Sequence, residues 1–343
     1  MSSQPQRHPM PLVTVLLPVY NAQPTLLCAL RSLQRQTLPD WECLLVDDGS
    51  TDSSLEVCER FAARDPHFRL LSQPHGGIVS ALNAGLSRAR GEFTARMDAD
   101  DLCHPDRLRL QAALLVSQLP LGLVGCLVRC FPDRLVAEGM RGYETWLNSV
   151  VTPEQIRRDI FVESPFAHPS VMARTSLLCQ VGGYQDHGWP EDYDLWLRLY
   201  ASGCGFAKVP ETLLYWREHA DRLSRTNPMY SLRAFRRAKV HYLKQTFLRV
   251  HSSVQIWGAG RGGRLFGMDL QQAGIGVERY IDIHSTKVGG RLRHAPIVPV
   301  SALGDHQPLP LLVCVGGPQP RAEIRQELTR LGYQETVDYV CVA

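Results

Sequence analysis

An acidic pair spaced two residues apart is the feature of this sequence most suited to chemistry. Asp98 and Asp100 lie in the run Met97-Asp98-Ala99-Asp100-Asp101, directly after an apolar segment. Carboxylates two apart at the end of a strand point the same way and can share one divalent cation. Oxygen ligands suit Mn²⁺ or Mg²⁺, and such an ion stabilises a diphosphate as a leaving group. Asp101 either supports this pair or caps the following helix.

The segments before this pair alternate in a regular way. Short apolar runs at 12–17, 43–46, 68–71 and 92–97 are separated by amphipathic helical patterns. Strands that alternate with helices of about 12 residues are typical of βαβ units and a parallel sheet. We therefore expect an α/β fold for this part of the chain.

Polar residues follow three of the four predicted strands. Tyr20 and Asn21 follow the first strand, Asp47 and Asp48 follow the second, and the acidic run follows the fourth. Ligands of such sheets bind in the crevice beyond the carboxyl ends of the strands. One such group could be a helix cap, but three groups at strand ends predict a single binding crevice.

The composition excludes several classes of protein. The chain has 343 residues, 44% hydrophobic, with 37 Lys and Arg against 34 Asp and Glu. Its length predicts roughly two domains at about 150 residues each. The near balance of charge argues against a nucleic-acid partner. The ten cysteines include no Cys-x-x-Cys pair, which disfavours structural zinc and favours free thiols in a reducing compartment.

Neither a signal peptide nor a membrane span is expected from the hydropathy pattern. Residues 1–10 lack the apolar core of a signal peptide, and the apolar stretch 110–128 reads as a helix, a turn and a strand. We therefore predict a cytoplasmic protein.

The alternation loosens after residue 153. Strands are predicted at 168–173 and 213–216, and a helix is predicted at 192–201, where Asp192 opens the helical pattern.

A basic segment follows at 222–250. No acidic residue occurs between Asp221 and Asp269, and a helix is predicted over 231–250. A basic amphipathic helix predicts peripheral contact with an anionic membrane at its inner, cytoplasmic face. The alternative is a linker helix with a solvated basic face, docked between domains.

A glycine-rich turn marks a second α/β unit. Gly258, Gly260 and Gly263 fit G-x-G-x-x-G between a predicted strand and a helix, and Asp282 lies 19 residues past Gly263. Backbone N–H groups at such a turn can bind a diphosphate, and the acid can meet a ribose hydroxyl. The unit is similar to small nucleotide-sugar-binding domains of some sugar acyltransferases. The alternative is a structural domain with an empty turn.

Residues 10–225 as a whole resemble the family 2 glycosyltransferases of the GT-A fold. The motifs that carry this resemblance are Pro18-Val19-Tyr20-Asn21, Val46-Asp47-Asp48-Gly49-Ser50-Thr51-Asp52, Asn83-Ala84-Gly85, Arg90-Gly91-Glu92, Asp98-Ala99-Asp100-Asp101, Pro105-Asp106-Arg107, His168-Pro169-Ser170, Glu191-Asp192-Tyr193-Asp194-Leu195-Trp196-Leu197-Arg198 and Tyr215-Trp216-Arg217-Glu218-His219. The chain departs from the family at His75, where Asn is frequent, and at Met97, where Leu or a small residue is frequent.

The resemblance over residues 10–225 and the sequence pattern after them together predict a domain plan. Residues 1–225 would form a catalytic domain with a GT-A-like mixed sheet flanked by helices. Residues 226–252 would be a basic helical linker, and residues 253–343 a smaller Rossmann-like α/β domain.

The resemblance also implies a set of donor-binding residues. An Asp would accept a hydrogen bond from the nucleoside base, and a Tyr would pack on its ring. Asp47 could instead hold the adjacent turn, Asn83 could reach the ribose or the second strand end, and Arg198 could form a salt bridge. The implied nucleotide-sugar-binding residues are Pro18, Tyr20, Asn21, Asp47, Asp48, Asn83, Asp98 and Arg198.

For catalysis the resemblance implies Asp192 as the general base of an inverting transfer, or Glu191 if the loop is shifted by one position. One carboxylate then takes the proton of the acceptor hydroxyl as it attacks. The alternative for Asp192 is a helix N-cap, and both roles can coexist. The implied metal ligands are Asp98, Asp100 and His219.

The predicted activity is an inverting, metal-dependent transfer of a sugar from a nucleoside diphosphate donor, UDP-linked, to a hydroxyl acceptor. The acceptor would be a glycan or a lipid-linked sugar in surface polysaccharide or glycolipid biosynthesis. One alternative is a sugar nucleotidyltransferase, although the first strand end lacks the Gly-rich basic loop that holds a triphosphate. Another is a non-catalytic nucleotide-sugar-binding protein. The oligomeric state is left open.

Overall fold

The computed structural model of this chain describes residues 10–304 and 309–343. These residues form two compact units: the first takes residues up to 153 with 166–186 and 203–225, and the second takes 154–165, 187–202 and 226 onward. Two segments of the predicted domain 1–225 therefore belong to the second unit, and the predicted boundaries stay a prediction. Residues 1–9, on which the signal-peptide prediction depends, lie outside the described part.

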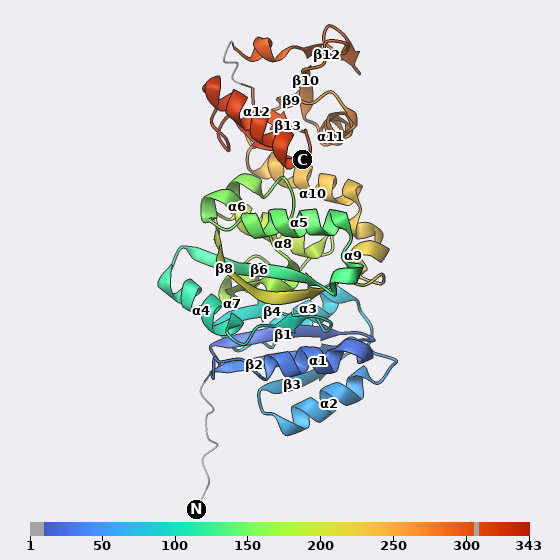
Figure 1. The fold of residues 1–343 in the computed structure, drawn as a ribbon, viewed down its shortest axis with the longest axis vertical. Helices are drawn as coiled ribbons and strands as arrows, with labels where there is room; N and C mark the ends of the chain where they lie inside the picture. Colours follow the sequence, from blue (N-terminus) through green and yellow to red (C-terminus); the bar gives the residue numbers. More distant parts are fainter. Residues whose placement is uncertain (1–9, 305–308) are drawn as a thin grey trace, which may run out of the picture. The chain divides into compact units, whose positions relative to one another are not determined.

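An eight-stranded mixed sheet forms the centre of the first unit (Figure 1). Its strands are β1 (Val13–Val19), β2 (Trp41–Asp47), β3 (Phe68–Ser72), β4 (Phe93–Arg96), β5 (Leu102–Cys103), β6 (Leu121–Phe131), β7 (Met172–Arg174) and β8 (Gly205–Arg217). Their order in the sheet is β3-β2-β1-β4-β7-β6-β8-β5. The first four strands of this order are parallel, and β7 runs antiparallel to both β4 and β6. The predicted α/β architecture with a mixed sheet is thus confirmed.

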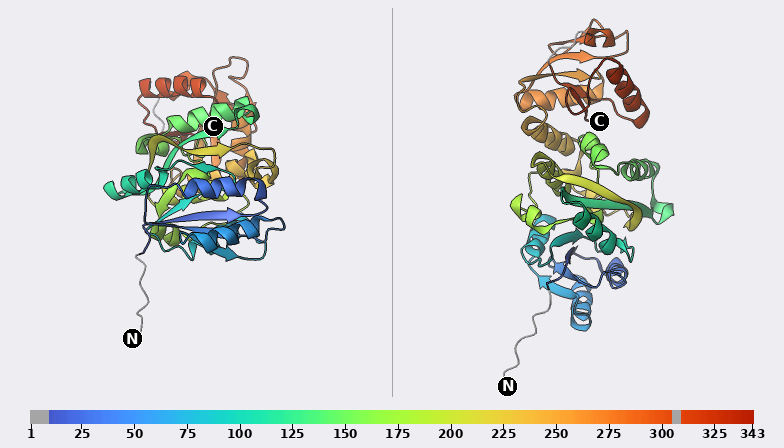
Figure 2. Two further views of the ribbon diagram at one scale, coloured as in Figure 1. Left: turned by 60° about the horizontal axis from the view of Figure 1, so that its bottom comes forward. Right: turned by 90° about the vertical axis from the view of Figure 1, so that its left-hand side faces the viewer.

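Helices lie on both faces of this sheet (Figure 2). In α1, Leu26, Ala29, Leu30 and Leu33 form the buried face, at the spacing of an amphipathic helix. The helices of the chain are α1 (Gln23–Leu33), α2 (Ser54–Arg64), α3 (Ile78–Leu86), α4 (Arg107–Ser117), α5 (Glu138–Ser149), α6 (Pro153–Asp159), α7 (Thr175–Gln180), α8 (Glu191–Ala201), α9 (Leu223–Thr226), α10 (Leu232–Gln245), α11 (Arg261–Gln272) and α12 (Pro318–Arg330).

The order of the first strands creates a crevice. β1 lies between β2 and β4, so the chain moves outward in one direction from β1 to β3 and then returns to the other side of β1 with β4. Such a reversal opens a crevice at the carboxyl ends of the strands. The polar residues after β1, β2 and β4 therefore face a common region.

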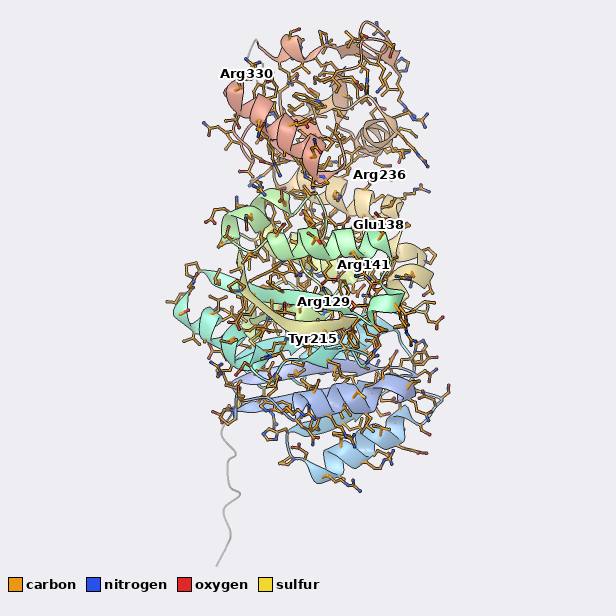
Figure 3. The ribbon with its side chains drawn as sticks, viewed as in Figure 1. Arg129, Glu138, Arg141, Tyr215, Arg236 and Arg330 are labelled. Atoms are coloured by element: carbon orange, nitrogen blue, oxygen red, sulfur yellow. The ribbon has the colours of Figure 1, made fainter. Side chains whose placement is uncertain are left out.

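Two further pairings extend the sheet beyond this region. β6 and β8 are parallel, with Arg129 opposite Tyr215 (Figure 3). β5, which comes directly after the acidic run, pairs antiparallel with the end of β8 through Leu102 and Tyr215. This pairing carries the residues that follow β8 to the acidic run.

The strand predicted at 168–173 is shorter than expected. His168–Ser170 forms a 3₁₀ turn (η2), and the strand β7 begins only at Met172. Pro169 has no backbone N–H to donate to a sheet ladder, which accounts for the difference.

A six-stranded sheet forms part of the second unit. Its order is β11-β12-β10-β9-β13-β14, and all its pairings are parallel except that of β11 with β12. Counted along the chain from β9, the parallel strands stand in the order third, second, first, fourth, fifth, which is the order of dinucleotide-binding folds. The strands are β9 (Ser253–Trp257), β10 (Gly276–Ile281), β11 (Arg291–Leu292), β12 (Ala295–Val298), β13 (Leu311–Val313) and β14 (Tyr339–Cys341).

Helix α10 packs as a core helix of the second unit. The structure begins it at Leu232, with the Ser231 hydroxyl accepting from the Ala234 N–H, and ends it at Gln245, five residues before the predicted end. Tyr242 on its buried face donates from its hydroxyl to Asp194 Oδ1 of α8 at 2.8 Å. This packing explains why 187–202 belongs to the second unit.

The cysteines and the helices agree with the compositional expectations. All ten cysteines lie within the described residues and are free, and seven of them are buried. Within residues 10–304 and 309–343, none of the helices combines the length and apolar character needed to cross a membrane.

A buried carboxylate ties three strands of the first sheet together. Glu42 on β2 is 2% exposed, and its oxygens accept hydrogen bonds from Thr14 Oγ1 at 2.8 Å, Arg69 Nη1 at 2.8 Å and Arg90 Nε at 2.9 Å. Burial raises the pKa of Glu42, but the Arg90, Arg69 and Thr14 bonds outweigh it and leave the pKa below its ordinary value. Glu42 therefore stabilises the fold in its charged form.

We expect Glu42→Gln to lower the free energy of unfolding by about 1.5–3 kcal/mol at pH 7, the range for hydrogen bonds to a charged group. Because the folded pKa is lowered, this stabilisation is present above the unfolded value near 4.5 and is lost as pH falls through the folded value. Urea unfolding of both proteins from pH 7 to pH 3 measures the difference, which should shrink in acid. Exposed Glu59→Gln is the control, and an equal loss in the control would refute the assignment.

Candidate functional site

Three carboxylates gather in the loop after β4. Oxygen atoms of Asp98, Asp100 and Asp101 lie within 4.8 Å of one another. Asp98 accepts from Arg96 Nη2 at 2.6 Å, and Asp101 Oδ1 accepts from the Arg217 N–H at 2.7 Å. The predicted pairing of Asp98 and Asp100 at one point is thus observed, and Asp101 joins them instead of capping α4.

The end of β8 holds this acidic loop. His219 Nε2 lies 2.8 Å from Asp100 Oδ2, and Arg217 Nε donates to the Asp100 carbonyl at 2.6 Å. His219 thus lies beside one of the two acids with which it is predicted to share a cation. The pairing of β5 with β8 is the structural reason for this proximity.

The acids of this loop oppose one another's ionisation. Burial raises the pKa of Asp98, but Arg96 and His168 outweigh it and hold the pKa below its ordinary value. Burial and the charge on Asp98 raise the pKa of Asp100. Burial, with Asp98 and Asp100, raises the pKa of Asp101 well above its usual range. The loop therefore carries more acid than its own cations neutralise.

These residues fit a divalent cation. Asp101 Oδ2 is buried and has no hydrogen-bond partner among the described residues. Two carboxylates that converge with an imidazole, next to an uncompensated buried oxygen, form a donor set of the kind that Mn²⁺ accepts, and the carboxylates alone suit Mg²⁺. The oxygens that lie together are those of Asp98, Asp100 and Asp101, and the predicted ligand set of Asp98, Asp100 and His219 stays a prediction.

An arginine missed by the sequence analysis lies near these acids. Arg222 donates to Glu218, and its guanidinium lies 4.2 Å from the ring centroid of Trp216. Its charge lowers the pKa values of Asp98, Asp100 and Asp101, although other causes are larger. Only the long-range fold shows this placement, because Arg222 is more than a hundred residues away from the acids in sequence.

An aromatic stack lies at the end of β1. Tyr20 is 48% exposed and stacks on His75 with ring centroids 4.1 Å apart and an interplanar angle of 23°. His75 Nδ1 lies 2.9 Å from Asp48 Oδ2. The departure from the family at His75 thus falls directly beside two of the predicted nucleoside-binding residues.

Asp48 is fully engaged within the chain. Its carboxylate accepts from Gln73 Nε2 at 2.6 Å, from the Gly76 N–H at 3.0 Å and from the Gly77 N–H at 2.8 Å. With His75, these donors fill the capacity of a carboxylate. Asp48 therefore holds the loop 73–77 in place. Its contact with a nucleoside base stays a prediction.

The carboxylate of Asp47, unlike that of Asp48, has few hydrogen-bond partners. It is 1% exposed, its Oδ2 makes only long contacts with the Ser50 N–H and the Ser72 hydroxyl, and its Oδ1 has no partner among the described residues. Pro18 lies opposite Val46 on the neighbouring strand β2. Of the two acids at the end of β2, Asp47 keeps the unused acceptor.

The side-chain amides of Asn21 and Asn83, both predicted to bind the donor, form hydrogen bonds with other parts of the chain. Asn21 has a positive φ of 48°, and its Oδ1 accepts from the Thr51 N–H at 2.8 Å. Asn83 holds both backbone groups of Tyr184, accepting from its N–H at 2.9 Å and donating to its carbonyl at 2.8 Å. The Tyr184 hydroxyl in turn lies 3.1 Å from His168 Nε2. Both amides position loops of the site, and their direct donor contacts stay predictions.

Glu191 and Asp192 begin α8 in the second unit. Glu191 is 2% exposed, and its Oε2 accepts from the Tyr230 hydroxyl at 2.5 Å. Asp192 is more exposed, and its Oδ1 accepts from the N–H of the next residue, Tyr193, at 2.6 Å. Asp192 therefore suits a proton-accepting role better than the buried Glu191. The predicted N-cap role of Asp192 is wrong, because α8 begins at Glu191 and Pro190 stands at its N-cap.

Arg198 pairs within its own helix. Its Nε donates at 2.7 Å to Asp194 Oδ2, and Asp194 is fully buried and also accepts from Trp189 Nε1 and the Tyr242 hydroxyl. The salt bridge considered as the alternative is thus present. A buried carboxylate needs this counter-charge, so the donor contact of Arg198 stays a prediction without support from these bonds.

The glycine-rich turn of the second unit has the backbone of a dinucleotide-binding turn. Gly258 has a φ of +114°, and a Cβ on Gly263 would lie 1.9 Å from the Gly258 carbonyl oxygen, so helix and strand approach closely there. Gly260 has open space around it. Asp282, however, accepts from the Ala259 N–H, the His284 N–H and Lys287 Nζ, each at 2.9 Å. A nucleotide contact at this turn stays a prediction.

Comparison with known proteins bears on this site. A family model described as glycosyl transferase family 2 matches residues 14–179. The chain is 32% identical over 227 residues to the putative glycosyltransferase EpsE of Bacillus subtilis, covering 65% of this chain and 78% of that protein. It is also 32% identical over 217 residues to the amylovoran biosynthesis glycosyltransferase AmsE of Erwinia amylovora, covering 62% and 79%.

A solved structure shows the same fold at low sequence identity. Residues 1–349 of TarS from S. aureus, solved in complex with UDP-GlcNAc, match this chain with a TM-score of 0.55 at 20% identity, covering 68% of this chain and 66% of that one. This likeness confirms the GT-A-like architecture of the mixed sheet. The matched region 14–179 contains the three acids after β4 but ends before Asp192 and His219.

The extent of these matches also decides between the predicted classes of protein. EpsE and AmsE are matched over more than three quarters of their own lengths, and both are glycosyltransferases by name. The alternatives of a sugar nucleotidyltransferase and of a non-catalytic binding protein are therefore set aside. The chain belongs to glycosyltransferase family 2 and is a glycosyltransferase.

Proposed function

We propose that this glycosyltransferase moves a sugar from a UDP-linked donor to an acceptor hydroxyl with inversion, in a reaction that depends on Mn²⁺ or Mg²⁺. The observation that carries the proposal is the convergence of Asp98, Asp100 and Asp101 after β4, with His219 Nε2 2.8 Å from Asp100 Oδ2. A site with surplus acid is suited to a cation and, through that cation, to a diphosphate.

The first unit supplies the donor side of this reaction. Asp98, Asp100 and His219 hold the cation, which when bound offsets the negative charge that develops on the departing diphosphate. Arg222 adds positive charge in the same region. The Tyr20 and His75 stack offers a flat surface for the nucleoside base, and Asp47 Oδ1 offers an acceptor for an N–H or hydroxyl group.

Asp192 is the proposed base. Asp192 accepts the proton of the acceptor hydroxyl while that oxygen attacks the anomeric carbon opposite the leaving group. One base is enough, because the diphosphate leaves without being protonated by the enzyme. This differs from glycoside hydrolysis, in which two carboxyl groups flank the bond and one of them protonates the departing oxygen.

The names of the relatives suggest the biological setting. AmsE is named for amylovoran biosynthesis, which supports a role for this chain in making a surface polysaccharide or glycolipid. The acceptor would then be a glycan or a lipid-linked sugar, and the enzyme would work in the cytoplasm with peripheral contact at the membrane.

A panel of nucleotide sugars tests the proposal directly. The purified protein is incubated with each donor, with or without Mn²⁺, and release of nucleoside diphosphate is measured. Release from a UDP-sugar that requires the metal is expected. Absence of release from every donor would refute the donor class, and equal release with EDTA would refute the metal.

We expect Asp100→Asn to lower metal-dependent turnover at least about a hundredfold, because it removes one charged ligand of a cation that contributes several kcal/mol to the transition state. Steady-state release of nucleoside diphosphate at saturating donor measures the effect, and thermal unfolding checks the fold. Asp133→Asn, at an exposed position of the same unit, is the control. Full turnover in Asp100→Asn would show that the ion is not held here.

We expect Asp192→Asn to lower kcat for transfer by about 10²–10⁴-fold, the usual contribution of a general base, while the affinity for the donor is kept. Transfer to acceptor and equilibrium binding of UDP are measured on the same preparations. Asp186→Asn, in the exposed loop just before α8, serves as the matched control. Transfer at the parental rate in Asp192→Asn would exclude Asp192 as the base.

A further inference from the structure

The start of α8, which carries the proposed base, is held by side chains from a later stretch of the chain. Tyr230, in the 3₁₀ turn η3 (Pro228–Tyr230), donates from its hydroxyl to Glu191 Oε2 at 2.5 Å. Tyr242 of α10 donates from its hydroxyl to Asp194 Oδ1 at 2.8 Å. The two tyrosines follow their acceptors by 39 and 48 positions in sequence, and both belong with α8 to the second unit.

An aromatic contact lies between these two hydrogen bonds. The ring of Phe235 on α10 packs against that of Tyr193, with centroids 5.2 Å apart, and Tyr193 is fully buried. Glu191, Tyr193 and Asp194 are thus each contacted from η3 or α10. Asp192 lies within this row and is more exposed than the residue on either side of it. The position of its carboxylate therefore depends on the backbone that its neighbours fix.

Asp194 has the largest number of hydrogen bonds among these anchored residues. Its carboxylate is fully buried and accepts from Trp189 Nε1 at 2.7 Å and from Arg198 Nε at 2.7 Å, as well as from Tyr242. Burial and the charge of Asp194 raise the pKa of Tyr242, so the hydroxyl stays protonated and remains a donor. Of the three donors named here, Tyr242 is the one that comes from outside residues 187–202.

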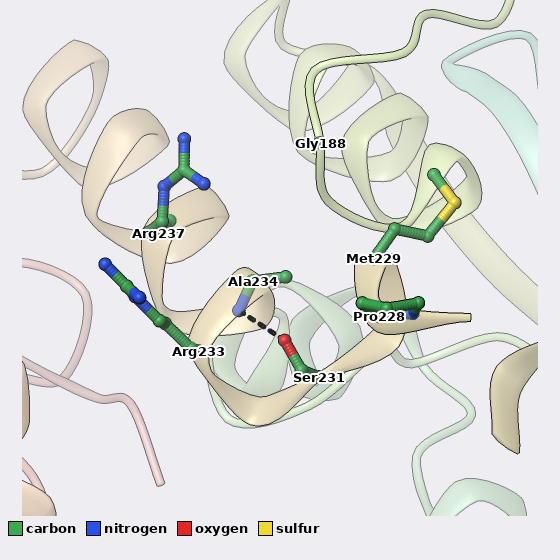
Figure 4. A pocket seen from close by; sticks show the side chains of 7 residues that line it. All are labelled: Gly188, Pro228, Met229, Ser231, Arg233, Ala234 and Arg237. Carbon is green, nitrogen blue, oxygen red and sulfur yellow. Dashed lines mark hydrogen bonds between the residues drawn. The ribbon is translucent and has the colours of Figure 1, made fainter. Parts of the chain in front are cut away.

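Packing alone gives the chain just before α8 little support. A hollow of about 320 Å³ is lined by Gly188 and by residues of η3 and α10, and in Figure 4 the chain at Gly188 passes across from Arg233 and Arg237. Gly188 has a φ of +74°, and a Cβ at this position would meet open space among the described residues. A space of this size removes contacts that would otherwise fix the chain there. Directional hydrogen bonds from Tyr230 and Tyr242 supply the constraint instead.

We propose that Tyr230 and Tyr242 are positioning residues for the proposed base, which hold the start of α8 so that the Asp192 carboxylate stays where it can accept the proton of the acceptor hydroxyl. A displacement of about 1 Å can lower a rate up to about a hundredfold, because reaction requires aligned groups. Residues 226–252, predicted from the sequence as a linker, then contribute to transfer without touching either substrate. The inference rests on the proposed function, since it concerns the base of that reaction.

The first test measures the mobility of α8 without catalysis. Hydrogen exchange of backbone amides is followed by mass spectrometry in the parent and in Y230F/Y242F, which removes both hydroxyls and keeps both rings. Amides at the start of α8 should exchange at least about tenfold faster, the effect of losing hydrogen bonds to charged acceptors, while those of the acidic loop 98–101 keep the parental rate. Unchanged exchange at α8 would overturn the proposal.

Tyr280→Phe is the matched control for both tests. Tyr280 is buried in the same unit, and its hydroxyl has no hydrogen-bond partner among the described residues. We expect Y280F to exchange at α8 and to transfer sugar as the parent does. The same change in Y280F as in Y230F/Y242F would overturn the proposal, because loss of any buried hydroxyl would then suffice.

The second test asks whether the tyrosines act through Asp192. We expect Y230F/Y242F to lower kcat for transfer about tenfold to a hundredfold, while KM for the donor and the affinity for UDP with Mn²⁺ stay within about twofold of the parent. In the Asp192→Asn background the same pair should have less than about a twofold further effect, because a positioning residue cannot act on an absent base. Equal effects in both backgrounds, or a loss of UDP affinity that matches the loss of kcat, would overturn the proposal.

Failure of this inference differs from failure of the proposed function. Reduced transfer in Asp192→Asn together with parental transfer in Y230F/Y242F would refute the positioning role alone. Parental transfer in Asp192→Asn would refute the base, and the inference with it. If the double variant does not fold, Y230F and Y242F are measured singly, and each should lower kcat about tenfold with UDP affinity unchanged. Parental kcat in both single variants would overturn the proposal.

Discussion

Mutual repulsion among three neighbouring acids, of which Asp101 is buried, is the constraint on which the first unit depends. Asp98, Asp100 and Asp101 follow one strand within four residues, so their charges cannot separate by any local change of the loop. The pairing of β8 with β5 brings the end of β8 to this loop. Two of the contacts that result fix the backbone of the loop, and His219 contributes an imidazole. A deficit of positive charge remains at the loop, and a divalent cation would offset it.

The donor side is built from loops that hold one another. Asp48 collects backbone N–H groups from the 73–77 loop, Asn21 binds the start of the 51–54 turn, and Asn83 clamps Tyr184. Each bond joins segments that belong to different strand ends. A crevice held in this way keeps its shape before any ligand enters, which lowers the ordering cost of binding. The family motifs around these residues thus serve the architecture of the pocket as much as its contacts.

Local patterns in the sequence predict the first strands and helices and the acid cluster. They do not predict which residues, distant in sequence, form hydrogen bonds or ion pairs with the site. The alternation of apolar runs and helices predicted β1 to β4 because each run is a complete local signal, and the spacing of Asp98 and Asp100 predicted their convergence. The pattern at 168–173 predicts a strand, but Pro169 cannot join a sheet ladder and η2 forms there instead. A salt bridge is one of two alternatives for Arg198 in the sequence, and only the structure identifies Asp194 as its partner. The roles of Asn83 and Arg222 depend on residues a hundred or more positions away, for which no local period exists.

The basic segment shows why charge composition alone cannot assign a surface. Eight Lys and Arg without an acid in 222–250 predict a strongly cationic helix, yet the partners of Arg236, Lys239 and Lys244 come from elements distant in sequence or from buried carbonyls. The tertiary structure therefore selects which cations stay available, and on α10 it leaves Arg233 and Arg237 beside a hollow. A diffuse attraction to anionic lipid needs many exposed charges spread over a face. On α10 the aromatic side chains between the cations instead determine what the helix does inside its unit, because Phe235 and Tyr242 contact residues of α8.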